Sequence, residues 1–456
     1  MQNKPINPIS RRTFFVQAGA ASAVAFQMAR AQGEKNRVAP SERLNIATVG
    51  AGGQAGANIR ELERTGRVNF LAFCDVDDKN AAGTYQQFPD VPTFKDFRRM
   101  LDQVKDIDAV LVATPDHIHA PATLAALQLG KHVYCEKPLT HTVHEARVIA
   151  KAAAEYKCVT QMGNQGTAFE GPRRLIEWIQ AGVIGTVREV HVWSDRPTHD
   201  GKLMWAQGIE RPADTPPVPD TLDWDLWLGP APERPYHPAY VPFKWRGWWD
   251  FGSGGLGDMG IHNIAPVFDA LRLDAPTSVT ASSTLFNEET LPLASTVYYQ
   301  FPERNGRAAI KLHWYDGGIL PPRPDELEPG EELDPEDGII LIGDKGKILI
   351  EGWGGNRPRL IPKSRMESEK MPPETIPPSK GHHLEWIEAC KGNGETRAPF
   401  SFAGPLTEAV LLGTVAVRTR RTLEWDSQNL RVTNVPEAND FITKTYRKGW
   451  ELGKLG

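Results

Sequence analysis

Two short motifs, far apart in the chain, hold the side chains best suited to proton transfer. Lys137 stands in the motif Glu136-Lys137-Pro138, at the end of an apolar run, where it can stabilise an alkoxide by hydrogen bonding. Asp258 and His262 are four residues apart, which places them on one face of a helix. We expect His262 to take a proton and Asp258 to orient or charge its imidazole. The alternative for the second motif is a helix start with a capping aspartate and an incidental histidine.

A glycine cluster within residues 44–56 has the spacing of a dinucleotide-binding turn between a strand and a helix. Gly50 permits the tight turn, Gly52 lets the backbone approach a pyrophosphate, and Ala55 takes the third small position of the G-x-G-x-x-G/A pattern. Gly53 belongs to the same cluster and is counted with the cofactor-binding residues. An ordinary glycine-rich turn shows the same pattern, so the motif alone leaves both interpretations open.

The end of the next β-rich run, residues 68–74, carries an acid that indicates which nucleotide is bound. Asp75 lies about 20 residues beyond the glycine turn, where a carboxylate accepts hydrogen bonds from both ribose hydroxyls. The same carboxylate would repel a 2′-phosphate, so we expect NAD rather than NADP. Asp77 and Asp78 are expected to be solvated acids at a helix start.

Strands that alternate with helices after this acid predict a parallel, doubly wound sheet. Apolar runs at residues 109–113, 132–135 and 158–162 read as strands, and amphipathic segments separate them. Thr142 and Glu145 have the spacing of a capping box at the start of one of these helices. The fold class is therefore α/β.

Ligands of such sheets bind outside the carboxyl ends of the strands, which here are followed by residues 114–119, 136–138 and 163–166. Asn164 and Gln165 could bind the nicotinamide carboxamide or the substrate, or form a plain turn. Asp116, His117 and His119 have the residue types of metal ligands. Cofactor packing accounts for His119, however, and we expect no metal.

The second half of the chain has a different pattern of apolar and polar residues. Alternating runs at 278–284, 295–301 and 308–314 predict half-buried antiparallel strands, and residues 339–350 predict a hairpin. Residues 195–251, here called the excursion, are rich in Pro, and six of the 13 tryptophans fall between residues 205 and 249. We expect this segment to be ordered and to pack over another part of the molecule. Its tryptophans could present ring faces to a sugar or form the core of the excursion. His382 and His383 are expected to cap a helix or lie on the surface.

Composition narrows the class of protein. A chain of 456 residues with 40% hydrophobic residues suggests two or three globular domains. The net charge of −5 makes it a poor nucleic-acid binder. The four cysteines lack C-x-x-C spacing and are read as free core thiols.

The amino terminus has the order of a twin-arginine signal peptide. Arg11 and Arg12 precede an uncharged, Ala-rich run, and Ala29-Arg30-Ala31 offers a cleavage site. We therefore expect residues 1–31 to direct export to the periplasm, with a disordered or helical tail as the alternative. No later stretch reaches the roughly 18 to 20 apolar residues that span a bilayer, so we expect no stable membrane insertion.

Together these motifs resemble the Gfo/Idh/MocA oxidoreductases, the glucose–fructose oxidoreductase and inositol dehydrogenase family. The resemblance rests on the glycine turn with Asp75, the T-P-x-x-x-H of residues 114–119, the E-K-P motif, and the G-G-x-x-D-x-G-x-H of residues 254–262. It implies a Rossmann domain at residues 43–162. It also implies a C-terminal α/β domain at residues 163–456, whose open, mainly antiparallel sheet lines the site and makes a dimer or tetramer interface.

The resemblance also implies roles for individual residues. Lys137 would contact the nicotinamide ribose and the substrate, and His262 would be the acid/base. Further cofactor-lining positions are Thr114, Pro115, His119 and Glu136. Trp245, Arg246 and Trp248 lie near the second motif in the sequence and are expected at the substrate. The excursion is longer than in compact family members.

We therefore predict an exported NAD-dependent oxidoreductase acting on a sugar, glycoside or cyclitol. Outside the cytoplasm no nucleotide pool would replace the cofactor, so we expect it to be retained. It would be recycled by oxidising one sugar and reducing another, or by redox-neutral elimination or epimerisation of a transiently oxidised glycoside. A non-catalytic NAD-binding sensor or scaffold is the alternative, against which the intact Lys137 and His262 argue.

Overall fold

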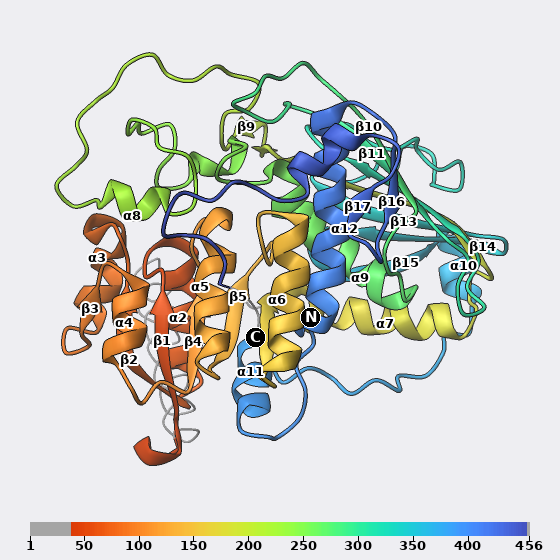
Figure 1. The fold of residues 1–456 in the computed structure, drawn as a ribbon. Helices are drawn as coiled ribbons and strands as arrows, with labels where there is room; N and C mark the ends of the chain where they lie inside the picture. Colours follow the sequence, from red (N-terminus) through yellow and green to blue (C-terminus); the bar gives the residue numbers. More distant parts are fainter. Residues whose placement is uncertain (1–37, 454–456) are drawn as a thin grey trace, which may run out of the picture.

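The computed structural model describes residues 38–453. The predicted signal peptide, residues 1–31, lies outside the described residues. The described chain forms an amino-terminal domain with a parallel sheet and a second domain with a larger mixed sheet, and the two stand side by side in Figure 1. The excursion arches from the second domain over the first.

The predicted doubly wound sheet is confirmed. Its six strands are parallel and have the order β3-β2-β1-β4-β5-β6, which reverses between β1 and β4. Ligands of such sheets bind at this reversal. The strands are β1 (Leu44–Val49), β2 (Val68–Cys74), β3 (Thr93–Phe94), β4 (Ala109–Val112), β5 (His132–Glu136) and β6 (Thr160–Gly163). The helices are α2 (Gly53–Arg64), α3 (Asp78–Gln87), α4 (Phe97–Gln103), α5 (Asp116–Gln128) and α6 (Val143–Glu155).

Local predictions in this domain also hold. The Thr142 hydroxyl accepts a hydrogen bond from the Glu145 amide at 3.2 Å, and Glu145 Oε2 accepts one from the Thr142 amide at 3.0 Å, so the capping box of α6 is present. All four cysteines are free, as predicted, but only Cys74 and Cys135 are buried in the core. Cys158, and Cys390 outside this domain, are half-buried.

The second domain is built on a nine-stranded sheet of order β15-β14-β13-β7-β12-β11-β10-β16-β17. Within the described residues β7 and β12 are its one parallel pair, so the sheet is mixed and mostly antiparallel, as the resemblance implied. The strands are β7 (Val187–Ser194), β10 (Ser278–Ser283), β11 (Ser295–Phe301), β12 (Ile310–Tyr315), β13 (Asp337–Gly343), β14 (Gly346–Glu351), β15 (Arg357–Ile361), β16 (Leu423–Asp426) and β17 (Arg431–Val432). A small hairpin, β8 (Thr198–His199) and β9 (Lys202–Leu203), stands apart.

The helices of the second half are α7 (Glu170–Gln180), α8 (Trp224–Leu228), α9 (Ile261–Ala270), α10 (Lys363–Ser368), α11 (His382–Cys390) and α12 (Phe400–Thr419). Of these, α11 and α12 pack against the first domain. A π-helical turn, Leu256–Gly260, directly precedes α9. Gly404 permits α12 to lie against α6, because a Cβ there would be 2.7 Å from the Cβ of Ala150, and Figure 1 shows these helices next to each other. Among the described helices α12 alone is long and apolar enough to cross a membrane, but 78% of its most apolar window is buried within the protein, as in a core helix.

The expectation for His382 and His383 is wrong. His382 is buried, and its Nε2 lies 3.0 Å from the carbonyl oxygen of Met162. His383 stacks on Tyr134 and contacts Asn58 Oδ1 at 3.1 Å. Both are covered because α11 packs against the parallel-sheet domain, a contact between segments more than 200 residues apart in the sequence.

The excursion is ordered and packs over the first domain, as predicted, with a hydrophobic core of its own. Leu222, Trp227, Tyr240, Trp248 and Phe251 are among its buried members. Trp248 is fully buried and its indole nitrogen donates to the Ala239 carbonyl, so the predicted substrate contact is wrong for this residue.

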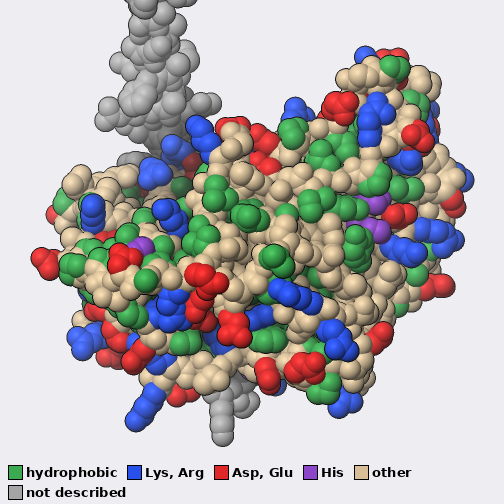
Figure 2. Space-filling view, turned by 90° about the horizontal axis from the view of Figure 1, so that it is seen from above, with side chains coloured by type: hydrophobic (Ala, Val, Ile, Leu, Met, Phe, Trp, Pro, Cys, Tyr) green, Lys and Arg blue, Asp and Glu red, His purple; other side chains and the backbone are tan. Residues whose placement is uncertain are grey.

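Acidic and basic side chains are interspersed on the face in Figure 2, unlike the basic stripe of a nucleic-acid binder.

Candidate active site

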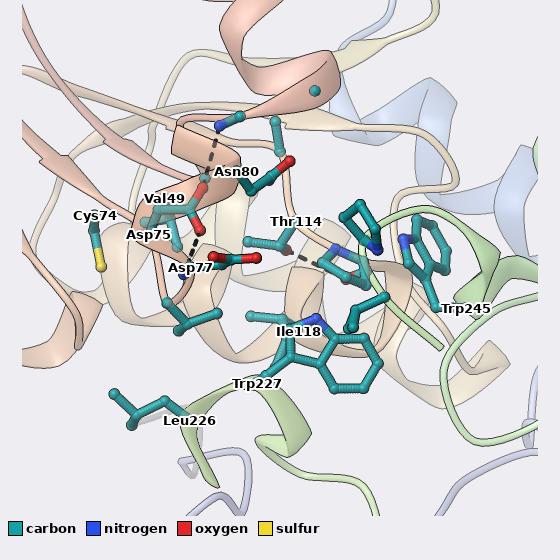
Figure 3. A pocket seen from close by; sticks show the side chains of 18 of the residues that line it. Val49, Cys74, Asp75, Asp77, Asn80, Thr114, Ile118, Leu226, Trp227 and Trp245 are labelled. Carbon is teal, nitrogen blue, oxygen red and sulfur yellow. Dashed lines mark hydrogen bonds between the residues drawn. The ribbon is translucent and has the colours of Figure 1, made fainter. Parts of the chain in front are cut away.

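A cleft runs along the carboxyl ends of β1, β2, β4 and β5, between the parallel sheet and the excursion. Its sheet side includes most of the predicted cofactor residues: Gly50, Gly52, Gly53, Asp75, Thr114, Pro115, Glu136 and Lys137. Its opposite side comes mainly from the excursion and includes Leu222, Leu226, Trp227, Phe243, Trp245 and Arg246. Trp450, near the C-terminus, completes the wall. Figure 3 shows side chains from both sides pointing into this space.

The glycine turn fits a dinucleotide. Gly50 has φ of +96°, and a Cβ on it would be 2.4 Å from the Ala113 carbonyl oxygen. Gly53 lies in the cleft wall, and a Cβ on it would meet nothing within 4 Å, so the backbone is open to the cleft there. No side chain caps the amino end of α2, which leaves its first amides for a pyrophosphate. Gly52 has a further reason to be glycine, since a Cβ on it would be 2.3 Å from Asn80 Nδ2.

Asp75 supports the glycine turn as well as lining the cleft. Its Oδ2 accepts hydrogen bonds from the amides of Ala51 (2.8 Å) and Gly52 (3.1 Å), and its Oδ1 accepts one from the Asp77 amide (2.9 Å). Burial raises the pKa of Asp75. A carboxylate oxygen has about two accepting positions, so about one remains, on Oδ1, for a ribose hydroxyl. Asp77 caps α3 through Lys79, as expected of a helix-start acid, and also lines the cleft.

Replacing Asp75 by serine, together with Val76→Arg, should shift nucleotide preference toward NADP(H). The change removes a negative charge and adds a positive one where a 2′-phosphate would lie. We expect the ratio of the NADP(H) and NAD(H) dissociation constants to change by about tenfold or more, which is about 1.4 kcal/mol. Fluorescence titration with both nucleotides measures it. Tighter NADP(H) binding by the unmodified protein would contradict the assignment of Asp75.

Lys137 is held in place by an ion pair with Asp258. Its Nζ lies 2.9 Å from both the carbonyl oxygen and Oδ1 of Asp258, and Arg246 Nε donates to the same Oδ1 at 3.0 Å. Burial alone would raise the pKa of Asp258, but Lys137 and Arg246 hold it well below its usual value. The carboxylate therefore orients Lys137 and Arg246, and the prediction that it orients His262 is wrong.

An amide orients His262 instead. His262 Nδ1 lies 2.8 Å from Asn164 Oδ1, and Asn164 Nδ2 donates to the Ile261 carbonyl at 3.0 Å. The amide oxygen can only accept, so the ring proton lies on Nδ1 and the lone pair on Nε2 is free to take a proton. Burial, and then the charge of Lys137, lowers the pKa of His262 well below its usual value. Asn164, predicted to contact the cofactor, is fully buried and positions the candidate base.

The remaining predicted polar residues form a second network. Glu136 Oε1 accepts hydrogen bonds from Asn58 Nδ2 (2.8 Å) and Gln165 Nε2 (3.0 Å), and Gln165 also donates to Tyr134 (3.2 Å). Burial raises the pKa of Glu136. Gln165 is half-buried, so its predicted role at the substrate stays a prediction.

His119 and His117 join loops and do not face the cleft. The two ring nitrogens of His119 contact the carbonyl oxygens of Pro138 (2.7 Å) and Thr114 (2.8 Å), which ties the two predicted loops together. The two ring nitrogens of His117 contact the carbonyl oxygens of Trp227 (2.9 Å) and Phe251 (3.3 Å), both in the excursion. Burial lowers the pKa of His119 to about 4. Neither ring has a nitrogen left for a metal.

Two residues near the site have surroundings that the sequence did not predict. Trp353 meets the His262 ring edge to face, with centroids 5.3 Å apart, and is 40% exposed, so it offers an apolar ring beside the candidate base. Asp116 is buried and accepts a hydrogen bond from Ser253 Oγ at 2.7 Å. Burial raises its pKa to about 7, against the opposing charges of Arg246 and Lys137.

Asp116→Asn should remove an ionisation near pH 7 from the pH profile of kcat/KM. In the unmodified protein Asp116 ionises as the pH rises through about 7 and adds negative charge near Lys137. The raised pKa of Asp116 also makes the stability of the fold depend on pH. Its contribution to folding is fully present at pH values below 3.8, the usual pKa of an aspartate, and is lost as the pH rises through about 7. Asp316→Asn is the control, since Asp316 also has a pKa of about 7 but is bonded to Ser295 and Trp314. Loss of the same inflection in the control alone would contradict the prediction.

Sequence models of known families match both domains. The model described as an oxidoreductase family with an NAD-binding Rossmann fold matches residues 44–164. The model of the same family's C-terminal alpha/beta domain matches residues 172–303. The chain belongs to the Gfo/Idh/MocA oxidoreductase family. The cleft described above is therefore in an NAD-binding Rossmann domain of this family.

Curated relatives in this family match over part of their length. An inositol 2-dehydrogenase from Rubrobacter xylanophilus is 33% identical over 116 residues, which are 25% of this chain and 33% of the relative. Inositol 2-dehydrogenase 3 from Saccharopolyspora erythraea is 32% identical over 158 residues, 34% of this chain and 46% of the relative. Levoglucosan dehydrogenase from Pseudarthrobacter phenanthrenivorans is 31% identical over 136 residues, which are 29% of this chain and 34% of the relative. The chain thus matches about a third to a half of the length of these relatives.

Solved structures of the Gfo/Idh/MocA fold are similar over nearly their whole length. An NAD-binding protein from Listeria innocua has a TM-score of 0.58 at 16% identity, covering 84% of this chain and 97% of the other. Aldose-aldose oxidoreductase from Caulobacter crescentus has a TM-score of 0.56 at 18% identity, covering 84% and 100%. At these identities the similarity shows the fold.

Proposed function

We propose that the protein is an NAD-dependent oxidoreductase that acts on a hydroxyl group of a sugar, glycoside or cyclitol. Two groups support this most directly: Lys137, which lines the cofactor cleft and is fixed by Asp258, and His262, which Asn164 orients and which is close enough to Lys137 for the lysine charge to lower its pKa. The names of the inositol and levoglucosan dehydrogenases among the relatives support the substrate class.

Each side chain has a defined task in this proposal. When bound, the nicotinamide accepts a hydride from the carbinol carbon of the substrate. Lys137 Nζ would donate a hydrogen bond to the substrate oxygen and stabilise its negative charge. His262 Nε2 would take the hydroxyl proton, since burial lowers the pKa of the ring and keeps it uncharged before the reaction. Asp258 and Arg246 would keep the lysine in place without competing for that proton.

Trp353 is the aromatic residue best placed to meet the substrate. Its exposed ring lies beside His262 and contacts Phe169, with centroids 5.0 Å apart. An apolar ring face there would pack on the C–H face of a sugar. Trp245 lines the cleft with Arg246, whose guanidinium lies 4.3 Å from its ring, and stays a predicted substrate or cofactor contact.

We propose in addition that residues 1–31 export the protein and that the cofactor stays bound. The sequence order of the signal supports export, and the cover that the excursion places over the cleft supports retention. Retention suits transfer between two sugars or redox-neutral elimination or epimerisation. An assembly of two or four copies through the nine-stranded sheet remains a prediction.

A screen of mixed sugars, glycosides and cyclitols, analysed by mass spectrometry, tests the proposed function. A new ketone two mass units lighter than its parent indicates net oxidation, and an isomer or elimination product indicates redox-neutral chemistry. Absence of any product with NAD-loaded protein across all three classes would favour the non-catalytic sensor or scaffold.

A further inference from the structure

The outer face of the nine-stranded sheet carries two histidines and a glutamate in adjacent positions. His191 on β7 and His313 on β12 are direct partners in the parallel ladder. Glu189 is two residues from His191 along β7 and so points to the same side of the sheet. Val190 and Val192, on either side of His191, point to the core. The three side chains are therefore on the opposite face of the sheet from the core that it shares with the cofactor domain.

The distances among these side chains match the ligand shell of a small metal ion. Glu189 Oε1 lies 3.3 Å from His191 Nε2 and 3.5 Å from His313 Nε2, and the three possible ligand atoms are all within 4.8 Å of one another. Tetrahedral zinc with bonds of about 2.0–2.1 Å places neighbouring ligand atoms about 3.3–3.4 Å apart. Small side-chain movements would therefore suffice to enclose an ion.

The surroundings prepare the histidines to act as ligands. Tyr315 Oη lies 3.0 Å from His191 Nδ1, so it can fix the ring and leave Nε2 directed toward Glu189. Of the nearby cations, Lys347 is paired with Glu326 at 2.7 Å. Lys311 is exposed, lies opposite Glu189 in the ladder and shares the face of β12 with His313. Glu189 supplies the one negative charge among the three.

We propose that Glu189, His191 and His313 form a binding site for Zn²⁺, with a fourth position open to water. Two imidazoles and one carboxylate suit zinc and disfavour Ca²⁺ and Mg²⁺, which take oxygen ligands. By joining β7 to β12, the ion would link segments more than 100 residues apart and stabilise the folded chain. The sequence-based expectation of no metal overlooked this site, because a spacing of 122 residues between the two histidines gives no motif.

The test is equilibrium zinc binding to the full chain, with zinc chloride as the only added metal and a fluorescent chelator as competitor. We expect one Zn²⁺ per chain at this site and a higher melting temperature with zinc. His313→Gln and Glu189→Gln should each weaken zinc binding by at least about 10- to 100-fold. Mutation of residues that only hydrogen-bond to metal ligands already causes a loss of this size. Tyr315→Phe should weaken binding less than either ligand variant. Circular dichroism shows whether each variant is folded, and Glu189→Gln, at a partly exposed residue, is the variant least expected to disturb folding.

His199→Gln is the matched control. His199 belongs to a second group of possible ligands, with Asp195 and Glu336, and should leave zinc binding by the first group unchanged. Anomalous diffraction at the zinc edge then locates the ion. Absence of zinc binding, unchanged affinity in both His313→Gln and Glu189→Gln, or loss of binding in His199→Gln alone would overturn the proposal. None of these results depends on the proposed oxidoreductase activity.

Discussion

Lys137→Ala should lower turnover by about 10²-fold or more while NAD binding and folding are largely kept. The lysine is the cation that can donate to a substrate oxygen at the cleft, and its loss leaves the alkoxide without that donor. Asp258 would keep Arg246 as its partner at 3.0 Å, so the variant does not bury an unpaired carboxylate. Steady-state kinetics on the best substrate of the screen, with NAD affinity measured by titration, separate the two effects.

His262→Ala is expected to have an effect of similar size, because it removes the proton acceptor rather than the alkoxide's donor. Lys95→Ala is the matched control. Lys95 also lines the cleft, but its ammonium group donates to the carbonyl oxygens of Val76 and Thr221, which places it at the excursion contact. The control should retain most of the turnover. Near-normal turnover in both Lys137→Ala and His262→Ala would contradict the mechanism and restore the sensor or scaffold alternative.

The pairing of Asp258 with His262 was predicted from a spacing that assumes an α-helix. The structure has a π-helical turn at Leu256–Gly260, directly before α9. Asp258 contacts Lys137 and Arg246, which other segments of the chain bring to it. A π-turn is a local adjustment to packing, and the composition of this segment does not encode it.

The strands and helices of the parallel sheet, the capping box and the hairpin were predictable because each is encoded by a short stretch of sequence. The parallel pairing then follows from the alternation of strands and helices. The partner of His262 was not, since Asn164 is 98 positions away and the two meet only when β6 and α9 are packed together. The same holds for Trp450, which reaches the cofactor cleft from the C-terminus. Trp248 shows the converse case: an aromatic residue near a catalytic motif in the sequence can be needed for the core of its own segment.

Hydrogen bonds hold the excursion to the Rossmann domain and to the C-terminal segment beside the cleft. Backbone hydrogen bonds join Asp78 to Thr221 (3.0 Å) and Asp223 to Val76 (2.8 Å). On another side Arg447, from the C-terminal segment, donates to Asp225 Oδ1 and to the Asp225 carbonyl, both at 2.6 Å, and to the Gly229 carbonyl at 2.9 Å. We expect these contacts to keep the excursion over the cleft and to slow the release of a bound dinucleotide.

Purified protein should therefore release close to one NAD(H) per chain when it is denatured, and should not require added NAD for redox-neutral turnover. Arg447→Ala should speed cofactor dissociation by about tenfold or more, because each lost hydrogen bond to a charged group is worth about 1.5–3 kcal/mol. Arg431→Ala is the matched control, since Arg431 is exposed and is paired only with Asp426 among the described residues. Stopped-flow displacement by excess labelled nucleotide measures the rates.

The stoichiometry decides between two kinds of enzyme. An exported protein that exchanged its nucleotide freely would stop after one turnover, so retention and export support each other. Protein recovered from the periplasm with bound NAD(H), slow release, and faster release in Arg447→Ala but not in Arg431→Ala would agree with recycling inside a closed cleft. Substoichiometric nucleotide together with activity that depends on added NAD would contradict it. The protein would then be a dehydrogenase that draws on a nucleotide pool, and residues 1–31 would need a purpose other than export.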